Sequence, residues 1–235
     1  MKLNTNSNTY ILAYASLLVI AVAFVLAYFS QALKPIQDKN VALDKKKQII
    51  AALNIRDVND NQVEEYYNKL VEADEIINEK NEVLSAGKPG GENDGFKLNG
   101  GDFKAGKLAL FVCNVDGQKK YVMPVYGMGL WGGISGYIAI NADKETIYGV
   151  YFNHEGETAG LGAEIKDNQK WQQQFCGKHL FADGNQDAVA LSVCKKVDNP
   201  AIQVDGVSGA TLTCDGVTRM IHEGLGKYLV FLKDK

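Results

Sequence analysis

A hydroxyl-rich segment, residues 205–213, holds the side chains best suited to chemistry in this sequence. It reads DGVSGATLT and lies between a strand pattern and an amphipathic helix pattern. Ser and Thr commonly cap a helix start, and Ser208, Thr211 and Thr213 suit that role. The free backbone N–H groups and the positive end of the helix dipole equally suit an anion such as a phosphate. The residue types alone leave both interpretations open.

A glycine-rich segment, residues 127–132, matches the pattern G-x-G-x-x-G as GMGLWG. That pattern marks a dinucleotide site only where a helix opens at the third glycine inside a βαβ unit. Here a strand pattern, GYIAINAD, follows at residues 136–143. We therefore expect a glycine-rich turn that lets a flat group approach the backbone, and no nucleotide site of the Rossmann type.

The cysteines and histidines form no recognisable metal or catalytic pattern. They are Cys113, Cys176, Cys194, Cys214, His154, His179 and His222. No two cysteines form a C-x-x-C pair, which disfavours a zinc or iron–sulfur site. The spacing indicates neither a Ser-His-Asp triad nor paired catalytic carboxylates, so a hydrolase is not expected. We expect Cys113 and Cys194 to be small buried hydrophobic residues, and disulfide pairing stays open.

The composition indicates a folded chain that does not bind nucleic acid. The chain has 235 residues, of which 46% are hydrophobic and 23% are charged, and this rules out wholesale disorder. The formal net charge is -3, so no basic field exists to hold a polyanion.

Residues 10–29 form the most apolar stretch, YILAYASLLVIAVAFVLAYF. Twenty helical residues at about 1.5 Å each match the roughly 30 Å hydrocarbon thickness of a bilayer. Aromatic residues stand at both ends of the run, as they do at membrane interfaces. A cleaved signal peptide is the alternative, because Ser30-Gln31-Ala32 has a small-x-small pattern, but the length of the run favours a spanning anchor.

The orientation of this segment in a membrane stays open at the level of charge. One lysine, Lys2, precedes it, and five follow it: Lys34, Lys39, Lys45, Lys46 and Lys47. This bias alone would place the C-terminal part in the cytoplasm. Long domains, however, can be exported regardless of the bias.

The residues that follow predict helices first. Residues 32–55 have a loose helical spacing that suggests a stalk, with Pro35 marking a kink or break. Residues 61–84 suggest a second, amphipathic helix, and the glycine-rich residues 85–107 indicate a loop.

From residue 108 onward the pattern changes to strands. Asp116-Gly117 predicts a tight hairpin between residues 108–115 and 119–126. Further elements are expected as strands at 136–143, 146–154 and 188–195, and as a helix at 163–178. A closing helix has one apolar face, made of Val217, Met220, Ile221, Leu225, Tyr228, Leu229 and Leu232. Together these elements predict an α+β domain with a mainly antiparallel sheet flanked by helices.

The hydroxyl-rich segment resembles a known motif. Asp205-Gly206-x-Ser208-Gly209-Ala210-Thr211 is similar to the flavinylation motif of the FMN-binding domain family, in which the Thr after Ser-Gly-Ala is joined to the phosphate of FMN by a phosphoester bond. The resemblance implies one covalent FMN per chain, attached to Thr211. It also implies that the neighbouring residues bind the cofactor; these are Asp205, Ser208, Gly209, Ala210 and Thr213.

Further segments resemble the C subunit of the Na+-translocating NADH:quinone reductases. They are LDKKKQIIAALNI (43–55), YGMGLWGGISGYIAI (126–140), ETAGLGAEI (157–165) and WQQQFCGK (171–178). That family commonly has Pro where this chain has Ala159. The resemblance implies that the isoalloxazine ring lies near Trp131, Glu157, Thr158, Leu161 and Gly162.

The same resemblance implies a role and a setting. The chain would be a membrane-anchored electron carrier in a complex with five other subunits, which oxidises NADH, reduces quinone and exports sodium ions. Its FMN would take electrons from an iron–sulfur centre and pass them to the FMN of a neighbouring subunit. A Mg2+-dependent FMN transferase would attach the flavin from FAD. The soluble domain would lie on the periplasmic side of the bacterial inner membrane.

We therefore expect four parts: a tail over residues 1–9, a transmembrane helix over 10–31, a helical stalk, amphipathic helix and linker over 32–95, and an FMN-binding domain over 96–235. Two other interpretations stay open. One is the G subunit of the related ferredoxin-linked ion-translocating complex, which shares the anchor and the Ser-Gly-Ala-Thr motif. The other is a flavin-free, membrane-tethered binding domain in which residues 208–213 only cap a helix.

Overall fold

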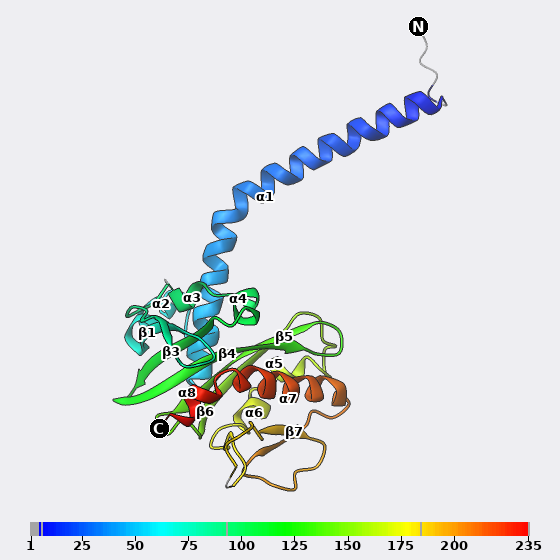
Figure 1. The fold of residues 1–235 in the computed structure, drawn as a ribbon. Helices are drawn as coiled ribbons and strands as arrows, with labels where there is room; N and C mark the ends of the chain where they lie inside the picture. Colours follow the sequence, from blue (N-terminus) through cyan, green and yellow to red (C-terminus); the bar gives the residue numbers. More distant parts are fainter. Residues whose placement is uncertain (1–4, 6, 93, 184, 235) are drawn as a thin grey trace. The chain divides into compact units, whose positions relative to one another are not determined.

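The computed structural model describes residues 5, 7–92, 94–183 and 185–234 and divides into two units (Figure 1). The first unit ends at Asp44 and consists mainly of helix α1 (Asn8–Ala52), which continues into the second unit. An 18-residue window of α1 has a mean hydropathy of 2.5 and buries none of its surface in the protein. By length and composition α1 can cross a membrane. The helix continues through Pro35 and does not break there.

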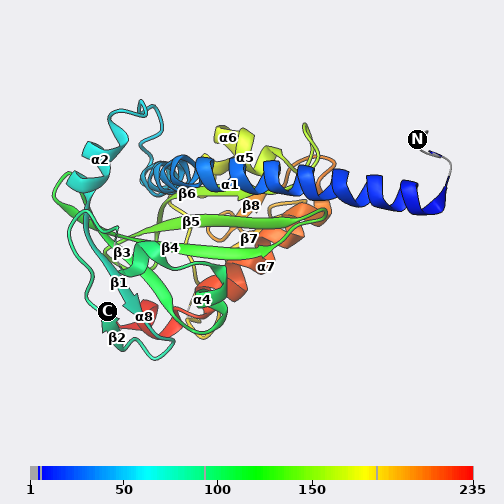
Figure 2. The ribbon, with the colours of Figure 1, turned by 90° about the horizontal axis from the view of Figure 1, so that it is seen from above.

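The second unit, from Lys45 onward, is built on one antiparallel sheet of strand order β2-β1-β3-β4-β5-β6 (Figure 2). The strands are β1 (Val71–Ile77), β2 (Val83–Ser85), β3 (Leu108–Val115), β4 (Gln118–Met128), β5 (Gly133–Asn141) and β6 (Ile147–His154). Asp116 and Gly117 join β3 to β4 with φ of 52° and 79°, as a type I′ hairpin turn requires. The predicted hairpin is therefore confirmed.

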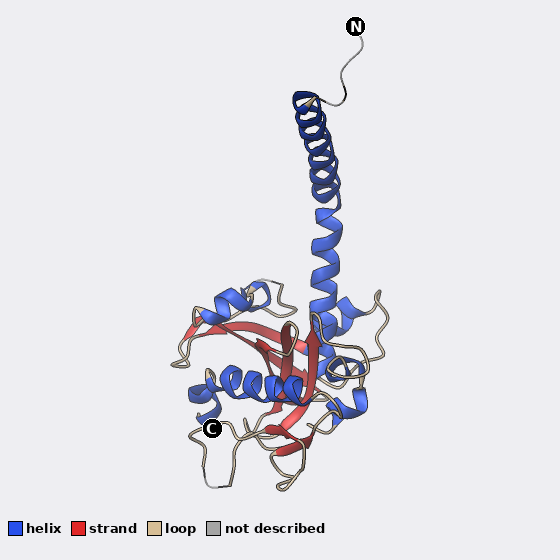
Figure 3. Ribbon diagram, turned by 90° about the vertical axis from the view of Figure 1, so that its right-hand side faces the viewer, coloured by secondary structure: helices blue, strands red, loops and turns tan. Residues whose placement is uncertain are grey.

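Helices pack on the sheet, and the last two helices form the C-terminal end of the chain. They are α2 (Val63–Leu70), α3 (Asp94–Lys97), α4 (Gly100–Lys104), α5 (Glu164–Asp167), α6 (Gln169–Gln173), α7 (Thr211–Gly226) and α8 (Leu229–Lys233). A short parallel pair, β7 (Ser192–Cys194) and β8 (Gln203–Asp205), precedes α7. Helix α7 packs on β4 and runs along the sheet (Figure 3). Its apolar face, including Val217, Ile221 and Leu225, is buried as predicted.

The predicted helix over residues 61–84 is wrong in its second half. Helix α2 ends at Leu70 and the chain continues directly into β1, which pairs with β3. Ile76 and Ile77 are β-branched and sit opposite β3, so pairing with a neighbouring strand prevails over the helical spacing. The second unit includes the residues from Lys45 onward, so β1 and the segment expected as a linker belong to it.

Three smaller expectations also change. Residues 85–107 hold α3 and α4 within the predicted loop. The predicted helix over 163–178 is two short helices, because Asn168 ends α5 and its side chain accepts a hydrogen bond from the Trp171 N–H to begin α6. The strand predicted over 188–195 is restricted to β7.

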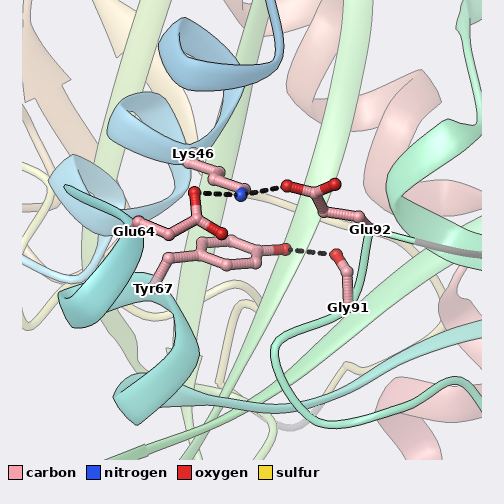
Figure 4. Close-up of polar contacts among 5 residues, drawn as sticks. All are labelled: Lys46, Glu64, Tyr67, Gly91 and Glu92. Carbon is pink, nitrogen blue, oxygen red and sulfur yellow. Dashed lines mark hydrogen bonds and ion pairs between the residues drawn. The ribbon is translucent and has the colours of Figure 1, made fainter. Parts of the chain in front are cut away.

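A buried lysine fastens the end of α1 to the rest of the second unit. The Lys46 ammonium, 1% exposed, lies between the carboxylates of Glu64 and Glu92 (Figure 4), and its Nζ is 2.5 Å from Glu64 Oε2. Burial lowers the pKa of Lys46, but the two hydrogen bonds outweigh burial and raise it above its ordinary value. The Tyr67 ring lies beneath the ammonium, and its hydroxyl donates to Gly91 O at 3.1 Å. Lys46 is therefore charged and paired.

The double substitution E64Q/E92Q is expected to lower the free energy of unfolding by about 1–3 kcal/mol, since it leaves a buried ammonium without a counter-charge. Adding K46M should recover most of that loss, because Met has a similar unbranched apolar chain and needs no partner. Thermal unfolding of the full chain in detergent, followed by circular dichroism, measures both. A triple variant no more stable than the double variant would contradict this account.

Candidate functional site

One pocket gathers three segments that are distant in sequence. They are the β4–β5 loop, the turn after β6 and the first turn of α7. The pocket has a volume of about 370 Å³ and is lined by Leu130, Trp131, Glu157, Thr158, Leu161, Gly162, Gly209, Ala210, Thr211, Leu212 and Thr213. All five residues predicted near a flavin ring, and four of those predicted around its phosphate, therefore line the same pocket.

The other two predicted residues, Asp205 and Ser208, line an adjacent pocket of about 310 Å³. Thr211 and Gly209 line both pockets. Lys195 also lines the second pocket, together with the carboxylates of Asp205 and Asp215. These side chains do not give the second pocket a net positive charge.

The β4–β5 loop is a tight glycine turn, as predicted. Gly129 N–H donates to Gly132 O at 2.9 Å, and β5 begins at Gly133, so no helix opens after the glycines. A Cβ on Gly129 would lie 2.4 Å from Glu157 Oε1, so a larger residue there would displace this carboxylate. The turn projects the Trp131 side chain outward, 69% exposed, while Trp171 is 4% exposed in the core. Trp131 is therefore a surface aromatic beside the pocket.

The start of α7 is not capped by a hydroxyl. Its N-cap position is Ala210, which has no side-chain oxygen and is a poor N-cap residue. Gly209 precedes it with φ of 76°, in the left-handed region that favours glycine. Ser208 and Thr211 are exposed, and Thr213 bonds elsewhere. In the part of the chain that the structure describes, the first-turn N–H groups of α7 therefore lack a Ser or Thr cap.

Glu157 is the charged centre of the pocket and is 7% exposed. Its Oε1 accepts from the Trp131 N–H at 2.9 Å, and its Oε2 accepts from the Thr213 hydroxyl at 2.6 Å. Burial opposes ionisation, but the hydrogen bonds from Thr213 and from the N–H groups of Trp131 and Leu130 prevail and hold the pKa of Glu157 below its usual value. The carboxylate is thus ionised at neutral pH.

Backbone contacts fix the strand that leads into the motif. Trp171 Nε1 donates to Asp205 O at 2.7 Å, and the Asp205 N–H donates to Gln174 Oε1 at 3.3 Å. Val207 N–H donates to Cys214 Sγ at 3.3 Å, which closes the turn between β8 and α7. The position of Thr211 is therefore set by β8, α6 and α7 together.

The cysteines are all free thiols, and the structure describes all four of them. Cys113 is buried as predicted, and burial raises the pKa of its thiol. Cys194 is only half-buried, so the expectation of full burial is wrong for it.

Sequence reasoning missed eight residues that line these pockets: Leu130, Leu212, Val193, Lys195, Gly206, Val207, Cys214 and Asp215. Leu130 and Leu212 each neighbour a predicted residue, Trp131 and Thr211, and both are exposed leucines. An apolar residue beside a predicted ligand residue was the available signal. Lys195 carried no such signal, because an exposed lysine after a strand is ordinary.

Comparison with known proteins identifies the family. Residues 129–226 match the model of the FMN-binding domain. The chain is 31% identical to the C subunit of the Na(+)-translocating NADH-quinone reductase of Haemophilus ducreyi, covering 99% of this chain and 97% of that one. It is 29% identical to the same subunit of Pseudomonas aeruginosa, covering 95% and 94%.

Two solved structures support the same family. The crystal structure of the same C subunit from Parabacteroides distasonis is 37% identical, with a TM-score of 0.78 over 86% of this chain and 98% of that chain. The crystal structure of NqrC from Shewanella oneidensis is 27% identical, with a TM-score of 0.65 over 83% and 100%. The predicted α+β fold is thus confirmed. The chain belongs to the family of C subunits of the Na+-translocating NADH-quinone reductases, which its sequence motifs resembled.

Proposed function

We propose that this chain is the covalently flavinylated electron-transfer subunit of a Na+-translocating NADH-quinone reductase, with FMN joined through its phosphate to Thr211. The observation that carries the proposal is the position of Thr211. It is exposed at the uncapped start of α7 and lines both pockets. The matched FMN-binding domain and the relatives' names support the same cofactor and complex.

The hydroxyls near α7 differ in their freedom to be esterified. Thr213 is 1% exposed and donates its hydroxyl proton to Glu157, so a phosphate cannot reach it without breaking that bond. Ser208 and Thr211 are exposed. The motif resemblance favours Thr211, and its place at the first residue of α7 puts a phosphate beside the free N–H groups.

The residues present fit an esterified phosphate. A diester keeps one negative charge, which a helix N-terminus can hold without an arginine cluster. The chain has two arginines, Arg56 and Arg219, and neither lines the two pockets. The N-terminus of α7 would therefore provide the favourable electrostatic interaction with the phosphate.

The pocket also fits a flat aromatic ring. Leu130, Trp131, Leu161 and Leu212 present exposed apolar side chains around it, an arrangement that a covering ring would stabilise. Trp131 offers a face for stacking. FMN, when bound, would supply one- and two-electron redox chemistry. The chain's own residues would hold the ring, shield one side of it from water and keep the ionised Glu157 carboxylate beside it.

The proposed setting includes a membrane and partners. Residues 10–29 of α1 would span the bacterial inner membrane, with the domain on the periplasmic side. Five other subunits would form the complex, with an iron–sulfur centre as electron donor and a neighbouring subunit's FMN as acceptor.

A Mg2+-dependent transferase would supply the flavin from FAD. In that reaction Thr211 Oγ1 would form the new bond to the FMN phosphorus, AMP would leave, and the hydroxyl proton would pass to the transferase or solvent.

T211A is expected to abolish covalent flavin while leaving the fold intact, because it removes the hydroxyl that forms the ester. S208A and T213V are the matched controls and should retain it. The measurement is intact mass and in-gel flavin fluorescence of the denatured full chain, co-expressed with the transferase. Flavin retained in T211A but lost in S208A would move the attachment to Ser208, and an unmodified wild-type chain would refute the proposal.

A second prediction concerns orientation, with Cys176 as the probe. Cys176 is exposed, while Cys113 and Cys214 are buried. Desolvation raises the pKa of the Cys176 thiol, so labelling at neutral pH is expected to be slow. A membrane-impermeant maleimide should label it in intact spheroplasts, and C176S should lose the signal. Labelling that appears only after lysis would place the domain in the cytoplasm.

A further inference from the structure

We infer that Glu157 is a positioning residue of the proposed flavin site, whose carboxylate ties the β4–β5 loop to the first turn of α7 and so sets the spacing between the ring pocket and Thr211. The inference rests on the proposed function for its consequence on a flavin. The tie itself belongs to the protein and can be tested without any flavin.

The two hydrogen bonds of Glu157 join segments that are far apart in the chain. Trp131 lies 26 residues before Glu157 and Thr213 lies 56 residues after it. Oε1 accepts from the Trp131 N–H at 2.9 Å, and Oε2 accepts from the Thr213 hydroxyl at 2.6 Å. One side chain therefore couples the residue that offers a ring-stacking face to the helical turn that begins with the proposed attachment residue.

Two glycines enclose this carboxylate. A Cβ on Gly129 would lie 2.4 Å from Oε1, and a Cβ on Gly162 would lie 2.4 Å from Oε2 and 2.7 Å from Thr213 Oγ1. Neither glycine has a positive φ, so close approach to the carboxylate, and not backbone conformation, is what requires them. A side chain at either glycine would displace the carboxylate and so disturb the tie.

The groups around Glu157 favour its ionised form, in which the carboxylate only accepts hydrogen bonds. Besides Glu157, the lining of the pocket includes no titratable side chain, and the described loop 129–132 and first turn of α7 contribute only N–H and hydroxyl donors. Among the residues that the structure describes, His154, at the end of β6, is the titratable side chain next to Glu157. Its Nδ1 accepts from the Glu157 N–H at 3.2 Å, which orients the start of the turn.

Three variants of the full chain separate geometry from charge. E157A removes the tie. E157Q removes the charge and can keep both contacts, because its amide oxygen can accept from Trp131 N–H while its NH₂ donates to the Thr213 hydroxyl, which also accepts. E155A is the matched control, since Glu155 is an exposed carboxylate two residues away.

Without flavin, the readout is amide hydrogen exchange of peptides covering 129–132 and 211–214 in the detergent-solubilised chain. We expect faster exchange in both peptides in E157A, and near-wild-type exchange in E157Q and E155A. Unchanged exchange in E157A would overturn the inference, whatever the outcome for flavin.

With flavin attached, E157A should still carry covalent FMN but should lose most of its visible circular dichroism, since the ring is no longer held in one orientation. E157Q should restore that signal and raise the reduction potential, because a negative charge beside the ring is gone. A merely structural Glu157 would lower stability in E157A and leave dichroism and potential at wild-type values in the folded fraction, which would refute the inference. A wild-type chain without flavin would refute the proposed function. The hydrogen-exchange result for E157A would still test whether Glu157 ties the β4–β5 loop to α7.

The ionised state of Glu157 predicts that its contribution to stability depends on pH. Because the folded-state pKa of Glu157 is lowered from its ordinary value of 4.5, the carboxylate contributes stability that is present above about pH 4.5 and is lost as the pH falls through the lowered pKa. The melting temperature of the wild type should exceed that of E157Q at neutral pH, and the difference should vanish in this acidic window. A difference independent of pH would contradict an ionised tie.

Discussion

The antiparallel sheet must be covered on both faces, and most of the structure follows from that requirement. Strand β3 is apolar along nearly its whole length and almost entirely buried, which an open-faced sheet would not allow. One face carries α7, and side chains such as Phe111 and Cys113 need another cover. Buried residues at the end of α1 and in α2, including Ile50, Val63 and Tyr67, belong to the same compact unit.

That requirement explains where charge enters the interior. The end of α1 brings Lys45 and Lys46 into the second unit, and both ammonium groups are satisfied: Lys45 by the carbonyls of Phe96 and Leu98, Lys46 by Glu64 and Glu92. Burial lowers the pKa of Lys45 to about 8. Two of the lysines counted in the sequence as flanking charge of a spanning segment thus serve internal contacts in the folded protein.

Local patterns predicted the elements whose determinants lie next to one another in the chain. The Asp116-Gly117 turn and the periodic face of α7 are of this kind, since a turn needs two residues and a helix face repeats every three or four. Strand β1 was missed because its pairing with β3 is a long-range interaction that overrides helical spacing. The pocket residues after β6 have no periodicity, so Glu157 and Gly162 could be singled out only through family resemblance. The contact of Glu157 with Thr213 lies beyond either kind of reasoning, because it depends on how α7 sits against the β4–β5 loop.

The contrast between the two tryptophans gives the molecule a built-in optical reporter. Trp171 packs against Phe152 and Phe175 in the core, and Trp131 stands in solvent at the pocket rim. An indole in water emits at longer wavelength than one in an apolar core, so the two emissions separate. Soluble quenchers would reach Trp131 and spare Trp171. A polypeptide that binds over the pocket would change the red component of the intrinsic fluorescence and leave the blue component as an internal reference.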